Sequence, residues 1–282
     1  MSEPKVQVVI PVYNAAKYLK RCLDSLENQT YPHWEAIIID DASKDESAKI
    51  VKEYMEKDER IVFFSLEKNQ GVSNVRNLAL EKLSEKYTAF LDSDDFWEKD
   101  ILEVMVEKAE KEKIDVVQCR FFYNYPGGKQ VLPKGAFETD TKINKRQIKK
   151  IYYKMATGIN MNHVCMKLIR TDLIKDLRFD TSLKTAEDLQ FCVKLFSSVE
   201  SYYFMDRAFY HYCRNEESLT GKGLSGKEKL KANRRVTADL LGAISKLGID
   251  TPLLKLLCYF RPYTIVVSKI FRMIKEKLFS KE

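Results

Sequence analysis

Long apolar runs are missing from this 282-residue chain. No run reaches about 18 apolar residues, so the sequence predicts no membrane-spanning helix. The short apolar run from Val6 to Val12 is followed at once by Asn14 and Lys17, and we therefore expect no secretory signal peptide. The expectation from both absences is a cytoplasmic protein.

Clustered cysteine and histidine are also missing. The six cysteines include no Cys-x-x-Cys pair, and the three histidines are dispersed along the chain. A disulfide framework or a zinc site would need regular or closely spaced residues of these types. We expect reduced, mostly buried thiols instead.

A net positive charge is missing from most of the chain and is confined to one end. Residues 221–282 contain 14 Lys plus Arg against 5 Asp plus Glu, a net charge of +9, which leaves −2 of the total +7 for residues 1–220. A near-neutral body argues against a protein that wraps nucleic acid. The sequence therefore predicts a globular domain over 1–220 and a basic helical region over 221–282 that meets an anionic surface.

Strand and helix patterns alternate over the first half, which we take as 1–115. Apolar strands are predicted at 6–12, 34–39, 61–66, 87–91 and 116–123, with helices after the first four. Asn14 is expected to cap the first helix, and Ser43 with Glu46 forms a candidate capping box for the second. Repeated strand–helix units of this kind predict an α/β fold with a mostly parallel sheet covered by helices.

The order changes in the second half, 116–220. Residues 125–129 predict a hairpin turn, 144–154 and 187–196 predict helices, and 202–204 and 209–213 predict two short aromatic strands. We expect this half to complete a pocket over the first.

Carboxylates are concentrated directly after the fourth strand, in Asp92-Ser93-Asp94-Asp95. Alternation along an extended chain sends Asp92 and Asp94 to the same side. Two carboxylates about 4 Å apart repel by roughly 1 kcal/mol in water and roughly 4 kcal/mol at an effective dielectric near 20. The cluster is therefore expected to hold a cation, a proton or a sugar hydroxyl, unless it is a polar turn in which Asp94 or Asp95 caps the next helix.

Polar segments also follow the other strands. In parallel sheets, ligands bind beyond the carboxyl ends of the strands. The segments 11–14, 40–43, 69–71 and 92–95 are therefore expected to meet at one rim of the sheet.

Five segments together resemble glycosyltransferase family 2. Members of this family have the GT-A fold and transfer a sugar with inversion at its anomeric carbon, assisted by a metal ion. They occur in the family's order and approximate spacing: Val9-Ile-Pro-Val-Tyr-Asn14, Ile38-Ile-Asp-Asp-Ala-Ser43, Asn69-Gln-Gly-Val-Ser-Asn-Val-Arg-Asn77, Phe90-Leu-Asp-Ser-Asp-Asp95 and Ala186-Glu-Asp188. The resemblance implies a UDP-sugar donor, Mn²⁺ or Mg²⁺, and a glycan or lipid-linked glycan acceptor in bacterial surface polysaccharide synthesis. A catalytically idle nucleotide-sugar-binding or scaffold protein on the same fold is the alternative.

The resemblance implies a nucleotide site built from five residues. Pro11 and Tyr13 would lie against uracil, although Tyr13 could instead pack beneath the following helix. Asp40 would accept a hydrogen bond from the uracil imide, and Asp92 would bind ribose. Arg76 would contact the nucleotide or pair with neighbouring aspartates.

Further roles follow from the same resemblance. Asp94 would ligate the metal, and Asp95 is left open as an outer-shell ligand or a helix cap. Asp41 would serve the turn after the second strand. That turn is expected to avoid a positive φ, because it has Ala42 where the family often has glycine.

The general base would be Asp188, supported by Glu187. The segment 185–188 also matches a capping box, which is the alternative role of these two carboxylates. Arg214 is expected to reach the diphosphate, and Lys167 and Arg170 are expected to face the acceptor.

The basic tail, 252–282, ends in an amphipathic pattern that begins at Tyr263. Pro262 is expected in its first turn, and Pro252 is expected to break the preceding segment. The sequence leaves three partners open for this helix, namely an anionic membrane surface, a second subunit of a homodimer, or its own domain.

Overall fold

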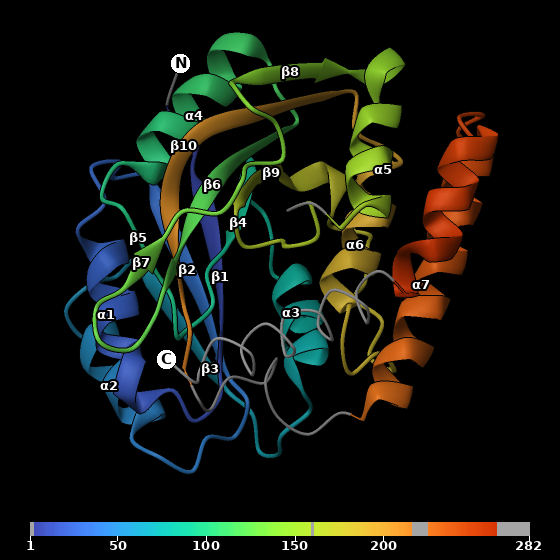
Figure 1. The fold of residues 1–282 in the computed structure, drawn as a ribbon. Helices are drawn as coiled ribbons and strands as arrows, with labels where there is room; N and C mark the ends of the chain where they lie inside the picture. The colour runs from blue at the N-terminus through green and yellow to red at the C-terminus, as the bar shows by residue number, and fades with distance from the viewer. Residues whose placement is uncertain (1–2, 159–160, 216–224, 264–282) are drawn as a thin grey trace, which may run out of the picture.

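The structure is a computed structural model, and it describes residues 3–158, 161–215 and 225–263. Its strands are β1 (Val6–Val12), β2 (Trp34–Asp40), β3 (Ile61–Ser65), β4 (Tyr87–Phe90), β5 (Phe96–Trp97), β6 (Val116–Asn124), β7 (Gln130–Val131), β8 (Thr141–Asn144), β9 (Lys167–Arg170) and β10 (Ser201–Cys213). Its α-helices include α1 (Ala16–Glu27), α2 (Ser47–Met55), α3 (Val72–Leu80), α4 (Ile101–Glu112), α5 (Lys149–Ala156), α6 (Glu187–Phe196) and α7 (Gly226–Lys246). Figure 1 shows α1 and α2 on one side of the sheet and α3, α6 and α7 on the other, so the expected α/β class is confirmed.

The first four strands form the predicted parallel part of the sheet. β1 pairs with β2 on one side and with β4 on the other, and β2 pairs with β3, all in parallel. Nearly every side chain of β1 and β2 is buried, because helices cover both faces. Their predicted bounds agree with the structure to within one residue.

The second half of the sheet is mixed. Between β4 and β6 lies β9, antiparallel to both, while β10 runs parallel to β6 and antiparallel to β5. Two separate aromatic strands were predicted here, and this is wrong, because β10 is continuous over 201–213. Register shifts between Phe204 and Tyr210 let the strand continue through the polar residues Asp206 and Arg207.

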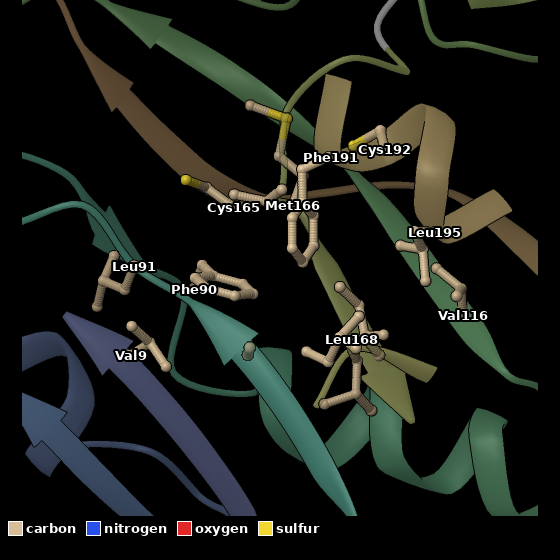
Figure 2. Close-up of a cluster of buried hydrophobic side chains, with 14 of the residues drawn as sticks. Val9, Phe90, Leu91, Val116, Cys165, Met166, Leu168, Phe191, Cys192 and Leu195 are labelled. Carbon is tan, nitrogen blue, oxygen red and sulfur yellow. The ribbon is translucent and has the colours of Figure 1, made fainter. Parts of the chain in front are cut away.

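One hydrophobic cluster includes side chains from both halves. Figure 2 shows Phe90 of β4 pointing towards Phe191 of α6, with Leu168 of β9 nearby. The Phe191 ring stacks on Phe179 with centroids 4.0 Å apart and meets Phe90 edge-on at 6.4 Å. This packing fixes the start of α6 relative to the end of β4.

Two of the predicted helix caps are wrong. Asn14 accepts a hydrogen bond from the Lys44 amide instead of capping α1, whose Ala16 amide donates to Asp45. The second helix begins only at Ser47, and the Ser43 hydroxyl donates to Asp40. Contacts between the loop after β1 and the loop after β2 thus take the place of capping by a neighbouring side chain.

The C-terminal region is helical as far as the structure describes it. Ser225 and Glu228 form a capping box at the start of α7, and residues 252–263 form a further helical segment. Pro252 begins this segment, and Pro262 lies inside it and does not open a new helix, which corrects the prediction. The amphipathic pattern beyond Tyr263 falls outside the described residues. None of the helices in the described ranges has the length and apolar character needed to cross a membrane.

Candidate active site

The expected rim borders a cavity of about 330 Å³ at the carboxyl ends of β1, β2 and β4. Seven of the predicted site residues line it, from five separate parts of the chain: Pro11, Tyr13, Asp41, Arg76, Asp92, Asp94 and Glu187. The lining residues that were not predicted include Tyr18, Tyr212 and Asn215. The sequence pattern therefore located the site but not its full wall.

The two aspartates after β2 have different surroundings. Asp41 lines the cavity, and its carboxylate accepts hydrogen bonds from the amides of Gln70 (2.7 Å) and Gly71 (2.8 Å). Asp40 is 1% exposed, is not among the described lining residues, and accepts from the hydroxyl and the amide of Ser43. Asp41 thus shapes the cavity loop, while the contact of Asp40 with uracil stays a prediction.

The turn after Asp41 is left-handed. Ala42 has φ of 59°, so the prediction that this turn avoids a positive φ is wrong. A residue with a Cβ costs roughly 1–2 kcal/mol in this conformation. The hydrogen bonds from Ser43 back to Asp40 and from the Asp41 amide to Val12 hold the turn in place.

Arg76 contacts several acidic residues at the site. Its side chain is buried, with Nη1 2.6 Å from Asp188 Oδ1 and Nη2 2.8 Å from Asp92 Oδ1, and Glu187 lies 3.9 Å from Nη1. Burial alone would lower the pKa of Arg76, but the charges of Asp188 and Asp92 outweigh it and raise the pKa well above its usual value. The predicted pairing of Arg76 with rim aspartates is confirmed.

The two acidic residues at the start of α6 have different surroundings. Asp188 uses one oxygen for Arg76, and its other oxygen accepts from the Val164 amide at 3.4 Å. Glu187 lines the cavity, and burial, followed by the charge of Asp188, raises its pKa to about 7. The capping-box alternative is wrong, because Ala186, with φ of 64°, precedes the helix and no side chain caps it.

The acidic motif after β4 contains two carboxylates that line the cavity and one, that of Asp95, that is buried and bonded to β10. Asp92 and Asp94 both line the cavity, but Ser93 between them lines it too, because residues 92–95 form a turn with a hydrogen bond from the Asp95 amide to the Asp92 carbonyl; the predicted extended alternation is therefore wrong. Burial, then the charge of Asp92, raises the pKa of Asp94. Asp95 is 1% exposed and accepts from the Tyr210 hydroxyl (2.6 Å) and the Cys213 amide (2.7 Å). The alternative that Asp94 or Asp95 caps the next helix is wrong, because α4 begins at Ile101 after Asp100.

The surroundings of Asp94 fit a hard cation. Asn215 Nδ2 donates to Asp94 at 2.9 Å, and Asn215 Oδ1 is buried with no hydrogen-bond partner among the described atoms. Mg²⁺ and Mn²⁺ prefer oxygen ligands and need only one or two from the protein when phosphates and waters supply the rest. In keeping with this, the described residues contain no cluster of three or more His, Cys, Asp or Glu side chains that could enclose a metal alone.

The three basic residues predicted to contact the substrates lie in different surroundings. Lys167 is 2% exposed and donates to the carbonyls of Met161 and His163, and Arg170 pairs with Asp115 at the end of β9 away from the cavity. The prediction that Lys167 and Arg170 face the acceptor is therefore wrong. Arg214 is exposed, with its guanidinium carbon 4.7 Å from the ring centre of Tyr123.

Comparison with known proteins defines the class. The family model described as glycosyl transferase family 2 matches residues 7–178, and the chain belongs to this family. The fold superposes on Staphylococcus aureus TarS 1–349 in complex with UDP-GlcNAc with a TM-score of 0.71 at 27% identity, covering 84% of this chain and 66% of that one. The expected GT-A fold is thereby confirmed.

Curated relatives include a glycosyltransferase of Streptococcus pneumoniae serotype 4, GlyA, 30% identical over 77% of this chain and 32% of its own length. The uncharacterized glycosyltransferase EpsJ of Bacillus subtilis is 28% identical over 77% of this chain and 63% of its length. The putative teichuronic acid biosynthesis glycosyltransferase TuaG of Bacillus subtilis is 47% identical over 37% of this chain and 42% of its length. The chain thus matches between about a third and just under two thirds of these relatives.

Proposed function

We propose that this protein transfers a sugar from a UDP-sugar to a hydroxyl group of a glycan or lipid-linked glycan, with inversion at the anomeric carbon. The observation that carries the proposal is the buried Arg76 at the wall of the cavity, which joins the wall residue Asp92 to Asp188, a residue behind the lining residues. The Arg76 guanidinium contacts Asp92, on the side proposed for the nucleotide, through Nη2, and it contacts Asp188, the candidate base, through Nη1. The similar TarS structure is a complex with UDP-GlcNAc, which supports a UDP-sugar donor here.

The donor nucleotide would occupy the β1–β2–β4 side of the cavity. Tyr13 is 44% exposed and offers a ring face to uracil, next to Pro11. Asp92 would accept from the ribose hydroxyls, and Asp40 or its neighbour Asp41 would accept from the uracil imide. Arg214 would approach the diphosphate from the far side of the cavity.

A divalent cation, Mn²⁺ or Mg²⁺, would be held by Asp94 with Asn215 beside it. Such an ion supplies Lewis-acid stabilisation of the negative charge on the UDP leaving group. The raised pKa of Asp94 supports this assignment, because a carboxylate desolvated beside Asp92 gains most from a nearby positive charge.

Asp188 would act as the general base for the attacking hydroxyl. Its carboxylate forms an ion pair with Arg76, and the Val164 amide orients it. An inverting transfer needs the base on the face of the sugar opposite the nucleotide. Glu187, whose pKa is raised to about 7, would carry a proton next to it in about half of the molecules at neutral pH.

The direct test is metal-dependent turnover of UDP-sugars. A screen of UDP-GlcNAc, UDP-glucose and UDP-galactose with Mn²⁺ should find one donor that raises the melting temperature and is slowly hydrolysed. A catalytically idle binding or scaffold protein would show the thermal shift without hydrolysis. Absence of both would contradict the proposal.

We also propose that the C-terminal region lies on an anionic membrane surface at the cytoplasmic face of the plasma membrane. The helix over 252–263 exposes five large apolar side chains at helical spacing, between 46% and 60% each: Leu253, Leu256, Tyr259, Phe260 and Tyr263. An exposed apolar face next to a basic segment favours interfacial binding. This location suits a role in surface polysaccharide synthesis, which the name of the teichuronic acid relative TuaG also supports. A homodimer through the same face is the competing outcome, and nothing supports nucleic acid as a partner.

A further inference from the structure

Aromatic side chains share one face of the paired strands β6 and β10. The register places Phe121 beside Tyr210 and Tyr123 beside Tyr212, so alternation sends these four side chains to the same side. Phe121 meets Tyr123 edge-on at 4.9 Å, and Tyr123 meets Tyr212 edge-on at 5.7 Å. The residues between them point the other way, where His211 stacks between Phe96 and Phe122.

This aromatic face reaches the proposed reacting centre at both ends. At one end Tyr212 lines the cavity together with Asp94. At the other end Phe121 lies 6.1 Å from the His163 ring, and the amide of the next residue, Val164, donates to Asp188. One ring of this face, Tyr212, thus shares the cavity wall with the proposed metal ligand, and another, Phe121, lies near the loop that contacts the proposed base.

The face continues outward to the β6–β7 hairpin. Tyr125 is 39% exposed, and its ring centre is 6.4 Å from that of Tyr123. The Arg214 guanidinium lies over Tyr123 at 4.7 Å and over Tyr212 at 5.5 Å, which braces the two rings. The hairpin turn is closed by hydrogen bonds between Tyr125 and Lys129 and between Gly128 and Tyr125.

We propose that Tyr125, Tyr123 and Tyr212 form an acceptor platform on which a sugar ring of the acceptor glycan stacks. The C–H face of a pyranose is apolar and weakly positive, so it packs well on the negative face of an aromatic ring, while tyrosine hydroxyls can bond to sugar hydroxyls. The platform runs from the open surface to the cavity wall. An acceptor lying along it brings a hydroxyl towards Asp188 from the side opposite the nucleotide. The assignment rests on the proposed glycosyl transfer.

The test separates acceptor use from donor use. Wild type and Tyr125→Ala are compared for UDP-sugar hydrolysis without acceptor and for transfer to a panel of soluble acceptors: cello-, chito- and malto-oligosaccharides and poly(ribitol phosphate). The platform predicts an acceptor KM raised about tenfold in Tyr125→Ala, with hydrolysis unchanged and Tyr125→Trp close to wild type. Leu132→Ala is the matched control, since Leu132 follows β7 of the same hairpin and is 45% exposed.

An unchanged acceptor KM in Tyr125→Ala would overturn the platform while leaving the proposed transfer intact. Hydrolysis by wild type without transfer to any saccharide of the panel would also overturn it. Loss of both hydrolysis and transfer already in wild type would instead contradict the proposed function, and with it the platform.

Discussion

Arg76 Nη1 lies 2.6 Å from Asp188 Oδ1, although 112 residues separate them in the sequence. The same guanidinium reaches Asp92 through Nη2, so one buried cation joins α3, the end of β4 and the start of α6. Planar guanidinium geometry allows this double contact, which a lysine ammonium could not reproduce at both distances. The relative position of the two proposed functional carboxylates therefore depends on Arg76.

Replacing Arg76 should lower both the stability of the protein and its activity. Arg76→Lys is expected to lose one of the two ion pairs and to lower the free energy of unfolding by about 3 kcal/mol, because it leaves a carboxylate without its buried partner. It should also lower kcat/KM for the UDP-sugar. Urea unfolding and steady-state kinetics measure the two effects. Arg207→Lys, whose exposed side chain pairs with Asp100, is the control and should change stability by less than about 0.5 kcal/mol.

The left-handed turn at Ala42 predicts a stabilising substitution. Ala42→Gly removes the Cβ penalty of a residue at φ of 59°, and part of that gain is offset by the greater freedom of glycine in the unfolded chain. A net gain of about 0.5–1 kcal/mol in the free energy of unfolding is expected. The control, Ala48→Gly within α2, should instead lose about 1 kcal/mol. Destabilisation by Ala42→Gly would contradict the strain at this turn.

Glu187 should make stability depend on pH. Its pKa is raised to about 7 from a usual value of 4.5, so the folded state holds this proton more tightly than the unfolded state does. The stabilisation is complete below about pH 4.5 and is lost as the pH rises to about 7. Glu187→Gln cannot ionise, so its melting temperature relative to wild type should rise between pH 5 and pH 8. A difference that stays constant over this range would contradict the assigned pKa.

The exposed helical face over 252–263 predicts lipid binding. The double variant Tyr259→Ser with Phe260→Ser should lose most of its cosedimentation with phosphatidylglycerol vesicles, while Met55→Ser, a substitution at an exposed apolar residue of α2, should not. Undiminished binding by the double variant would contradict a membrane role for this face. Light scattering distinguishes the competing outcome, in which the double variant converts a dimer to a monomer.

Local patterns predicted several individual elements well. The strand Val6–Val12 and the helix Glu187–Phe196 agree with their predicted bounds, because a continuous apolar run and a regular helical periodicity each define one element without help from distant residues. The cavity rim followed from the rule that polar residues after parallel strands converge.

Features set by distant contacts were not predictable in this way. Asn14 was predicted to be a cap but bonds to Lys44, thirty positions along the chain, and Lys167 was predicted to face the acceptor but holds a buried loop. The antiparallel insertion of β9 depends on pairing between segments about 80 residues apart, which periodicity does not encode. Tyr212 and Asn215 were missed as wall residues. The alternation of aromatic residues along β10 was the available signal for Tyr212.

The most direct test of the proposed mechanism is Asp188→Asn measured for two properties in parallel. Transfer from the identified UDP-sugar should fall by at least about a hundredfold, while the affinity for UDP with Mn²⁺ should stay within about threefold of wild type. Asp172→Asn, which alters a 57% exposed carboxylate paired with Arg170 outside the cavity, should leave both unchanged. Transfer at the wild-type rate in Asp188→Asn would contradict the assignment of Asp188 as the base.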